Sequence, residues 1–235
     1  ASVAREAIRV VGGLDPCPQQ VIQKVMRVAA LRKDDARKDA LAFIGALDPT
    51  VPENVSLFLR ESANSDQAIR CIAAGFLARA KLEGPRNLEL GARFVRDDQE
   101  EVVVAGARMI AKQSKVDRNG TMGLVITLLG NRFGSCRSVA EATFREMEPF
   151  GQADLPVLAR GLEERVPETK CRVLGILSGM ETDARNVATS VAGLLMDESA
   201  IVRAKAATCL VSLKAEFQLV QGPLFVAATR DKVPD

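Results

Sequence analysis

Apolar residues recur at helical spacing along the chain, and the stretch 197–213 shows this pattern most clearly. Its apolar stripe advances in steps of four, four and three residues and consists of Val202, Ala206, Leu210 and Leu213. Such steps keep the side chains on one face of an α-helix. Asp197 or Ser199 precedes the stripe, and either side chain can accept a hydrogen bond from the free amides of a first helical turn. The pattern predicts a capped amphipathic helix.

Weaker copies of this helix recur about every 33 residues. Each copy has a marker residue, and the markers are Arg5, Arg37, Arg70, Val104, Arg137, Arg172 and Arg203. They lie 32, 33, 34, 33, 35 and 31 residues apart. In four copies an acidic or amide residue stands six places before the marker, namely Asn64, Asp98, Asn131 and Asp197. A repeat of this length built from paired helices predicts an α-solenoid.

Turn residues and prolines separate each copy from a preceding helix. These first helices are expected at 19–31, 52–60, 88–95, 122–129, 155–162 and 184–196. Residues 217–229 suggest a further first helix, and 230–235 resemble the opening of another copy. We therefore expect one all-α domain over residues 1–235. Both ends look truncated, so a fragment of a longer array is an open expectation.

The Asp/Asn-x5-Arg pattern and the Val202-Arg203-x-x-Ala206 core resemble the HEAT-repeat family of α-solenoids, over nearly the whole chain. The resemblance implies a right-handed solenoid of about six to seven helical hairpins whose second helices line the concave side. It also implies an internal ladder, formed by Arg37, Arg70, Arg137, Arg172 and Arg203 with Asn64, Asp98, Asn131 and Asp197. The ladder is expected to be interrupted at Val104, which lacks the Arg, and at Arg172, which lacks the acidic partner.

The amino-acid composition excludes several kinds of catalytic and metal-binding site. The chain contains no His, which excludes Ser-His-Asp and Cys-His catalysis and every His-based metal site. Carboxylate pairs stand at the predicted helix starts, where their negative charge interacts favourably with the helix dipole. We therefore interpret them as capping residues and not as metal ligands or catalytic groups. We expect no catalytic, cofactor-binding or metal-binding residue, no cofactor, and no enzymatic activity.

The five cysteines form no CxxC motif and predict small buried apolar side chains in a reducing, cytoplasmic setting. A secreted or periplasmic protein after signal removal stays an open alternative. No apolar run reaches the ~18–20 residues of a membrane span, so membrane insertion is not expected.

Two surface features suggest binding. Cationic residues off the apolar stripe of the second helices form a candidate contact surface, namely Arg9, Lys38, Arg108, Arg145 and Lys205. Small residues on the same helices either permit tight packing or open a groove for a partner helix or peptide; these are Ala42, Ala74, Gly75, Gly106, Ala142 and Thr208.

We expect a non-enzymatic scaffold or adaptor that binds a protein or peptide on its concave face. The net charge of +2 gives no global attraction to nucleic acid, and Glu141 and Glu146 interrupt a basic patch. The alternatives are a nucleic-acid-binding HEAT-like protein that uses second-helix Arg and Lys, and a regulatory or chaperone subunit of an enzyme complex.

Overall fold

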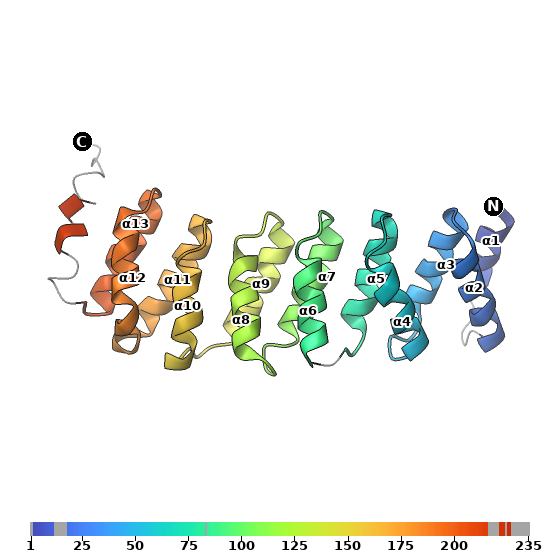
Figure 1. The fold of residues 1–235 in the computed structure, drawn as a ribbon, viewed down its shortest axis with the longest axis horizontal. Helices are drawn as coiled ribbons and strands as arrows, with labels where there is room; N and C mark the ends of the chain where they lie inside the picture. The colour runs from blue at the N-terminus through green and yellow to red at the C-terminus, as the bar shows by residue number, and fades with distance from the viewer. Residues whose placement is uncertain (1, 12–17, 83, 216–220, 224, 227–235) are drawn as a thin grey trace. The chain divides into compact units, whose positions relative to one another are not determined.

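The computed structural model describes residues 2–11, 18–82, 84–215, 221–223 and 225–226, and the side chains of 2–5, 9 and 181–183 lie outside that description. Every element assigned in the described part is helical (Figure 1), which confirms the all-α prediction. In the first part of the chain the helices are α1 (Ser2–Val11), α2 (Gln19–Leu31), α3 (Asp35–Ala46), α4 (Pro52–Glu61), α5 (Gln67–Arg79), α6 (Gly84–Phe94) and α7 (Glu100–Ala111). The remainder are α8 (Arg118–Leu129), α9 (Gly134–Glu146), η1 (Gln152–Asp154), α10 (Leu155–Gly161), α11 (Pro167–Gly179), η2 (Glu181–Val187), α12 (Ala188–Gly193), η3 (Leu194–Met196) and α13 (Ala200–Ser212).

The chain forms two compact units, residues 1–109 and 110–235. In the first unit α2 packs on α3, α4 packs on α5, and α3 also contacts α5. In the second unit α8 packs on α9, α10 packs on α11, and α11 contacts α13. Neighbouring second helices therefore contact each other in both units, and in the second unit the first helices α8 and α10 contact each other as well. The prediction of a single domain over 1–235 stays a prediction.

The apolar stripe of the second helices is buried. In the best-defined copy Val202, Ala206, Leu210 and Leu213 are at most 4% exposed, as the spacing predicted. One position of the stripe recurs every 33 or 34 residues with a large buried side chain each time, as Ile44, Leu77, Ile110, Phe144, Leu177 and Leu210. In the first unit the rings of Phe58 and Phe76 add an aromatic contact at 4.3 Å between centroids. The side chains that recur with the repeat are thus part of the buried core of each unit.

Helix boundaries differ from expectation at three places. α6 begins at Gly84, four residues before the expected start at 88. α8 begins at Arg118, four residues before the expected start, because the Asp117 side chain caps it by accepting a hydrogen bond from the Gly120 amide at 2.9 Å. The helix expected over 184–196 consists instead of η2, α12 and η3. This stretch contains Asn186, Thr189 and Ser190, which favour local backbone bonds over a continuous α-helix.

None of the described helices combines the length and apolarity needed to cross a bilayer. Several expectations fall on parts that are not described: the side chains of Arg5 and Arg9, Cys17, most of 217–229, and 230–235.

Candidate binding site

An arginine in the first turn of a second helix binds the backbone of the turn before it in α5, α9 and α13. Its Nη1 donates to the carbonyl oxygens six and five residues earlier. The distances are 3.2 and 3.1 Å for Arg70, 2.7 and 3.2 Å for Arg137, and 2.7 and 2.9 Å for Arg203. We call this arrangement the carbonyl clamp. It fixes the direction in which each of these helices leaves its turn.

The residue six places before the clamp position makes a second local contact. Its side-chain oxygen accepts a hydrogen bond from the backbone amide two residues later, which is an Asx turn. The residues are Asn64, Asp97, Asn131 and Asp197, with distances of 2.9, 2.9, 3.0 and 2.9 Å. The side-chain cap expected from Asp197 or Ser199 is not formed. The Ser199 side chain accepts no bond from the first turn of α13, and the Asp197 side chain accepts from the Ser199 amide, which precedes the helix.

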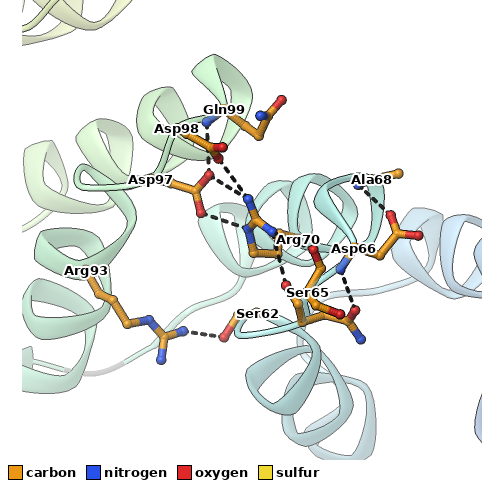
Figure 2. A network of polar contacts seen from close by, with 10 residues as sticks. Ser62, Ser65, Asp66, Ala68, Arg70, Arg93, Asp97, Asp98 and Gln99 are labelled. Carbon is orange, nitrogen blue, oxygen red and sulfur yellow. Dashed lines mark hydrogen bonds and ion pairs between the residues drawn. The ribbon is translucent and has the colours of Figure 1, made fainter.

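The clamp position also joins neighbouring hairpins within each unit. In Figure 2 the guanidinium of Arg70 faces Asp97, to which its Nε donates at 2.9 Å, and its Nη2 reaches Asp98 at 2.9 Å. Lys170 donates in the same way to Asp197 at 2.6 Å. Arg37 donates instead to both oxygens of Glu61, at 2.8 and 3.0 Å. We call these contacts ladder links.

Two of the ladder links lower the pKa of an aspartate, Asp97 in the first unit and Asp197 in the second. Burial by itself raises the pKa of Asp97, but the hydrogen bonds from Arg70 and from the Gln99 amide outweigh it, and the pKa lies below its usual value. The pKa of Asp197 is lowered in the same way, since the bonds from Lys170 and the Ser199 amide outweigh its burial. Both carboxylates therefore favour the ionised form in the fold.

The observed contacts move two markers and add Asp97 to the ladder, where Asp98 also bonds Arg70. Lys170, and not Arg172, occupies the position of Arg70 and Arg203, while Arg172 is exposed. Asp97, and not Asp98, makes the Asx turn. Val103 replaces Val104 as the marker because its amide bonds the carbonyl four residues earlier, as the amides of Arg70, Arg137, Lys170 and Arg203 do. The corrected markers are Arg37, Arg70, Val103, Arg137, Lys170 and Arg203, which lie 33, 33, 34, 33 and 33 residues apart. Choosing markers by residue type alone had shifted two of them.

The predicted contact residues with described side chains differ in their surroundings. Lys38 is engaged in an ion pair with Asp66 at 2.8 Å. Arg108, Arg145 and Lys205 are exposed on α7, α9 and α13. Lys205 lines a cavity of the second unit, so the structure joins this candidate to a site.

That cavity is a groove of about 810 Å³ in the second unit, and we call it the α11 groove. Its walls come from the turn after α9, from α11 and from α13, and its lining residues are Glu148, Pro149, Phe150, Cys171, Arg172, Gly175, Ile176, Gly179, Met180 and Lys205. Arg172 and Lys205 each stand two residues after a clamp position, so the repeat presents one cation from each of two adjacent second helices. Burial raises the pKa of the Cys171 thiol, which therefore favours the neutral form.

Two glycines keep the α11 groove open. A Cβ added to Gly175 or Gly179 would meet nothing within 4 Å. Gly106, in contrast, lies against Phe94, whose Cβ would be 2.7 Å from an added Cβ, so this glycine serves close packing. The small residues expected on the second helices divide accordingly: Ala74 and Gly106 are buried, whereas Ala42, Gly75, Ala142 and Thr208 are exposed.

Sequence reasoning missed Arg172, Gly175 and Gly179 as groove residues. The signal that identifies them is the corrected spacing, which aligns Arg172 with Lys205 and Gly175 with Gly75. No cluster of three or more His, Cys, Asp or Glu side chains able to hold a metal occurs in the described part of the chain.

No protein-family model matches the sequence, and neither does any curated protein. Among solved structures, two crystal structures described as engineered proteins are similar. One is 14% identical, with a TM-score of 0.45, and the match covers 82% of this chain and 96% of that one. The other is 15% identical, with a TM-score of 0.46, and the match covers 90% of this chain and 64% of that one.

Proposed function

We propose that the chain is a non-enzymatic interaction module whose hairpins continue as one right-handed HEAT-like solenoid. The support is the buried stripe position that recurs every 33 or 34 residues, together with the clamps of Arg70, Arg137 and Arg203, which lie in the same register two repeats apart. A buried position at a near-constant interval favours an array in which each hairpin buries its apolar face on the next. In such an array the second helices would form the concave face.

We further propose that the second-helix face binds a protein partner through the α11 groove. The observation that carries this proposal is the open groove itself, about 810 Å³ beside α11. Ile176, Met180 and Phe150 provide an apolar wall, and the thioether of Met180 can adapt to different side-chain shapes. Arg172 and Lys205 lie at its edge and suit a carboxylate. An amphipathic helix or peptide with apolar and acidic residues fits this lining.

Photo-cross-linking tests the proposed partner site. The cross-linking amino acid benzoylphenylalanine replaces Gly175 in the α11 groove, and the matched control carries it at Gly75, the equivalent exposed position of α5. In cells that express the full chain we expect a discrete cross-linked protein from position 175 and none of that mass from position 75.

The double variant Arg172→Glu, Lys205→Glu sharpens the test. We expect it to abolish the cross-link from position 175 while the thermal melt is unchanged, because both side chains are exposed. Equal products from both positions would contradict the site. A product that disappears on nuclease treatment would favour the nucleic-acid alternative.

A further inference from the structure

A second groove lies in the first unit, between the first helices α4 and α6, and its rim is rich in arginine. It has a volume of about 520 Å³, and its lining residues are Leu59, Arg86, Glu89, Leu90, Ala92, Arg93 and Arg96. Three guanidinium groups and one carboxylate give this lining a net charge of +2. We call it the α6 groove. A cationic groove of this kind is not expected from the chain's overall charge, which is itself only +2 over 235 residues.

The arginines of the α6 groove retain donors that can bind an anion. The side chains of Arg86 and Arg96 are exposed and form no hydrogen bond or ion pair with the described residues. Arg93 is positioned by its own surroundings: its Nη2 donates to the Ser62 hydroxyl, as Figure 2 shows, and its guanidinium carbon lies 5.5 Å from the centre of the Phe94 ring. One of its five N–H groups is thereby used, and the others remain for a ligand.

The spacing of the arginines suits an elongated ligand. Arg86 and Arg93 are seven residues apart on α6, which corresponds to about 10 Å along a helix axis. A single small anion cannot bridge that span, whereas a chain with several anionic groups can. Leu59, Leu90 and Ala92 between the charges provide an apolar contact for an uncharged side chain of the same ligand.

Glu89 distinguishes between a peptide and a nucleic acid. Its carboxylate lines the groove between Arg86 and Arg93 in sequence, and it has no partner among the described residues. A phosphodiester backbone has no donor for it and would be repelled. A polypeptide has backbone N–H groups that can donate to Glu89 while acidic side chains bind the arginines. The groove also has no aromatic side chain in its lining on which a base could stack.

We propose that the α6 groove binds an acidic peptide segment that contains at least one apolar residue. Carboxylates of the segment bind Arg86, Arg93 and Arg96, an apolar side chain lies against Leu59 and Ala92, and Glu89 accepts a backbone N–H. The site belongs to first helices of the first unit. It is therefore separate from the α11 groove, which second helices of the second unit form.

Fluorescence anisotropy of the full chain with a labelled peptide of repeating Glu-Glu-Leu tests the proposal. We expect saturable binding that weakens about tenfold or more in Arg86→Glu, Arg96→Glu, since two charge-assisted contacts are lost. The control, Arg108→Glu, Arg145→Glu, changes the net charge equally at two other exposed sites and should alter the affinity by less than about twofold. Circular dichroism melts confirm that each variant is folded.

Two further measurements define the site. Ala92→Trp keeps every charge but fills the groove, and we expect it to weaken peptide binding about as much as the charge reversal does. Arg86→Lys, Arg96→Lys should bind with intermediate affinity, because Lys keeps the charge and loses the bidentate geometry. The lysine pair also gives a folded comparison if the glutamate pair fails to fold.

The proposal is overturned if no saturable binding appears up to about 1 mM peptide, if the control weakens binding as much as the groove variant, or if Ala92→Trp binds normally. It is also overturned if single-stranded oligothymidylate binds more tightly and with the same dependence on Arg86 and Arg96. If the peptide instead depends on Arg172 and Lys205, the α6 groove is wrong and the α11 groove remains.

Discussion

Helices α5 and α11 are second helices of different units, and equivalent positions in them are 100 residues apart. Their inner positions have the same chemistry. Arg70 and Lys170 both donate to an Asp located 27 residues later, and Leu77 and Leu177 are both fully buried. Their outer positions differ, because Arg172 replaces Ile72 and Gly179 replaces Arg79.

The presence of Gly179 in α11, where α5 has Arg79, explains why a groove opens beside α11. On α5, Arg79 extends back to the preceding second helix, where its Nη2 donates to the Gly45 carbonyl, and its guanidinium lies 5.9 Å from the Phe76 ring. On α11 the equivalent residue is Gly179, which has no side chain to span that distance. The comparison teaches that packing determines the inner positions of the repeat, whereas the outer positions can vary and generate a local surface.

The largest expected effect tests whether the inner positions are equivalent. Leu77→Ala and Leu177→Ala should each lower the free energy of unfolding by about 2–5 kcal/mol through a core cavity. Urea denaturation of the two variants measures this. The matched changes Leu77→Met and Leu177→Met should cost less than about 1.5 kcal/mol, because they preserve volume. A loss below 1 kcal/mol for either alanine variant would break the equivalence.

Variants of Asp197 separate the ladder link from the Asx turn. Asp197→Asn keeps an oxygen for the Ser199 amide but loses the charge that binds Lys170, whereas Asp197→Ala loses both. We expect Asp197→Ala to cost about 1–3 kcal/mol and Asp197→Asn to cost less. Thermal melts give the order. An equal cost for both variants would mean that the turn bond contributes nothing.

Acid should weaken the ladder links of Asp97 and Asp197. The pKa values of Asp97 and Asp197 are lowered in the fold, so their contribution to stability is complete above a pH of about 4, the pKa of an unfolded Asp. It is lost as the pH falls from there through the lowered folded pKa. Urea midpoints measured between neutral and acidic pH should fall in this window.

The variants Asp97→Asn and Asp197→Asn test the origin of that pH dependence. Each removes one carboxylate of the ladder, so each should flatten the acid limb of the urea-midpoint curve. An acid limb unchanged in both variants would assign the dependence to other carboxylates.

The smallest expected effect concerns the open glycines. Gly75→Ala and Gly175→Ala should each stabilise the chain by about 0.5–1 kcal/mol, because an added Cβ meets nothing within 4 Å and alanine favours the helix. Calorimetry of both variants measures the gain. If Gly175→Ala alone lowered the stability, the added methyl group would be meeting neighbouring atoms, and the α11 groove would be narrower than the structure indicates.

Much of the fold follows from spacing. The interval of about 33 residues, the 19–31 helix and the buried stripe at Leu210 were all predicted, because burial of one helix face imposes a period that the sequence must obey. The marker Lys170 was not predicted, because a cation was expected to be Arg, and Val103 was not, because no cation marks that copy. The link to Asp197 needs only one donor, so Lys170 serves, and the repeat tolerates the change.

The candidate site was predicted only in part. Lys205 was identified as an exposed cation, but its neighbours in the groove come from the turn after α9 and from α11. Which side chains meet across two helices depends on the residues that are small at the contact. Taken alone, Gly179 indicates only a residue of low helix propensity. Its role in leaving the α11 groove open becomes visible only when it is aligned with Arg79.

The carbonyl clamp has a consequence for the order of folding. Arg137 reaches back only six residues to the Asn131 carbonyl, so closing that contact costs little chain entropy and requires no distant part of the chain. Contacts this local can form within microseconds, well before two hairpins meet. Each hairpin then meets its neighbour with the exit angle of its second helix already set, and assembly reduces to the docking of preformed corners.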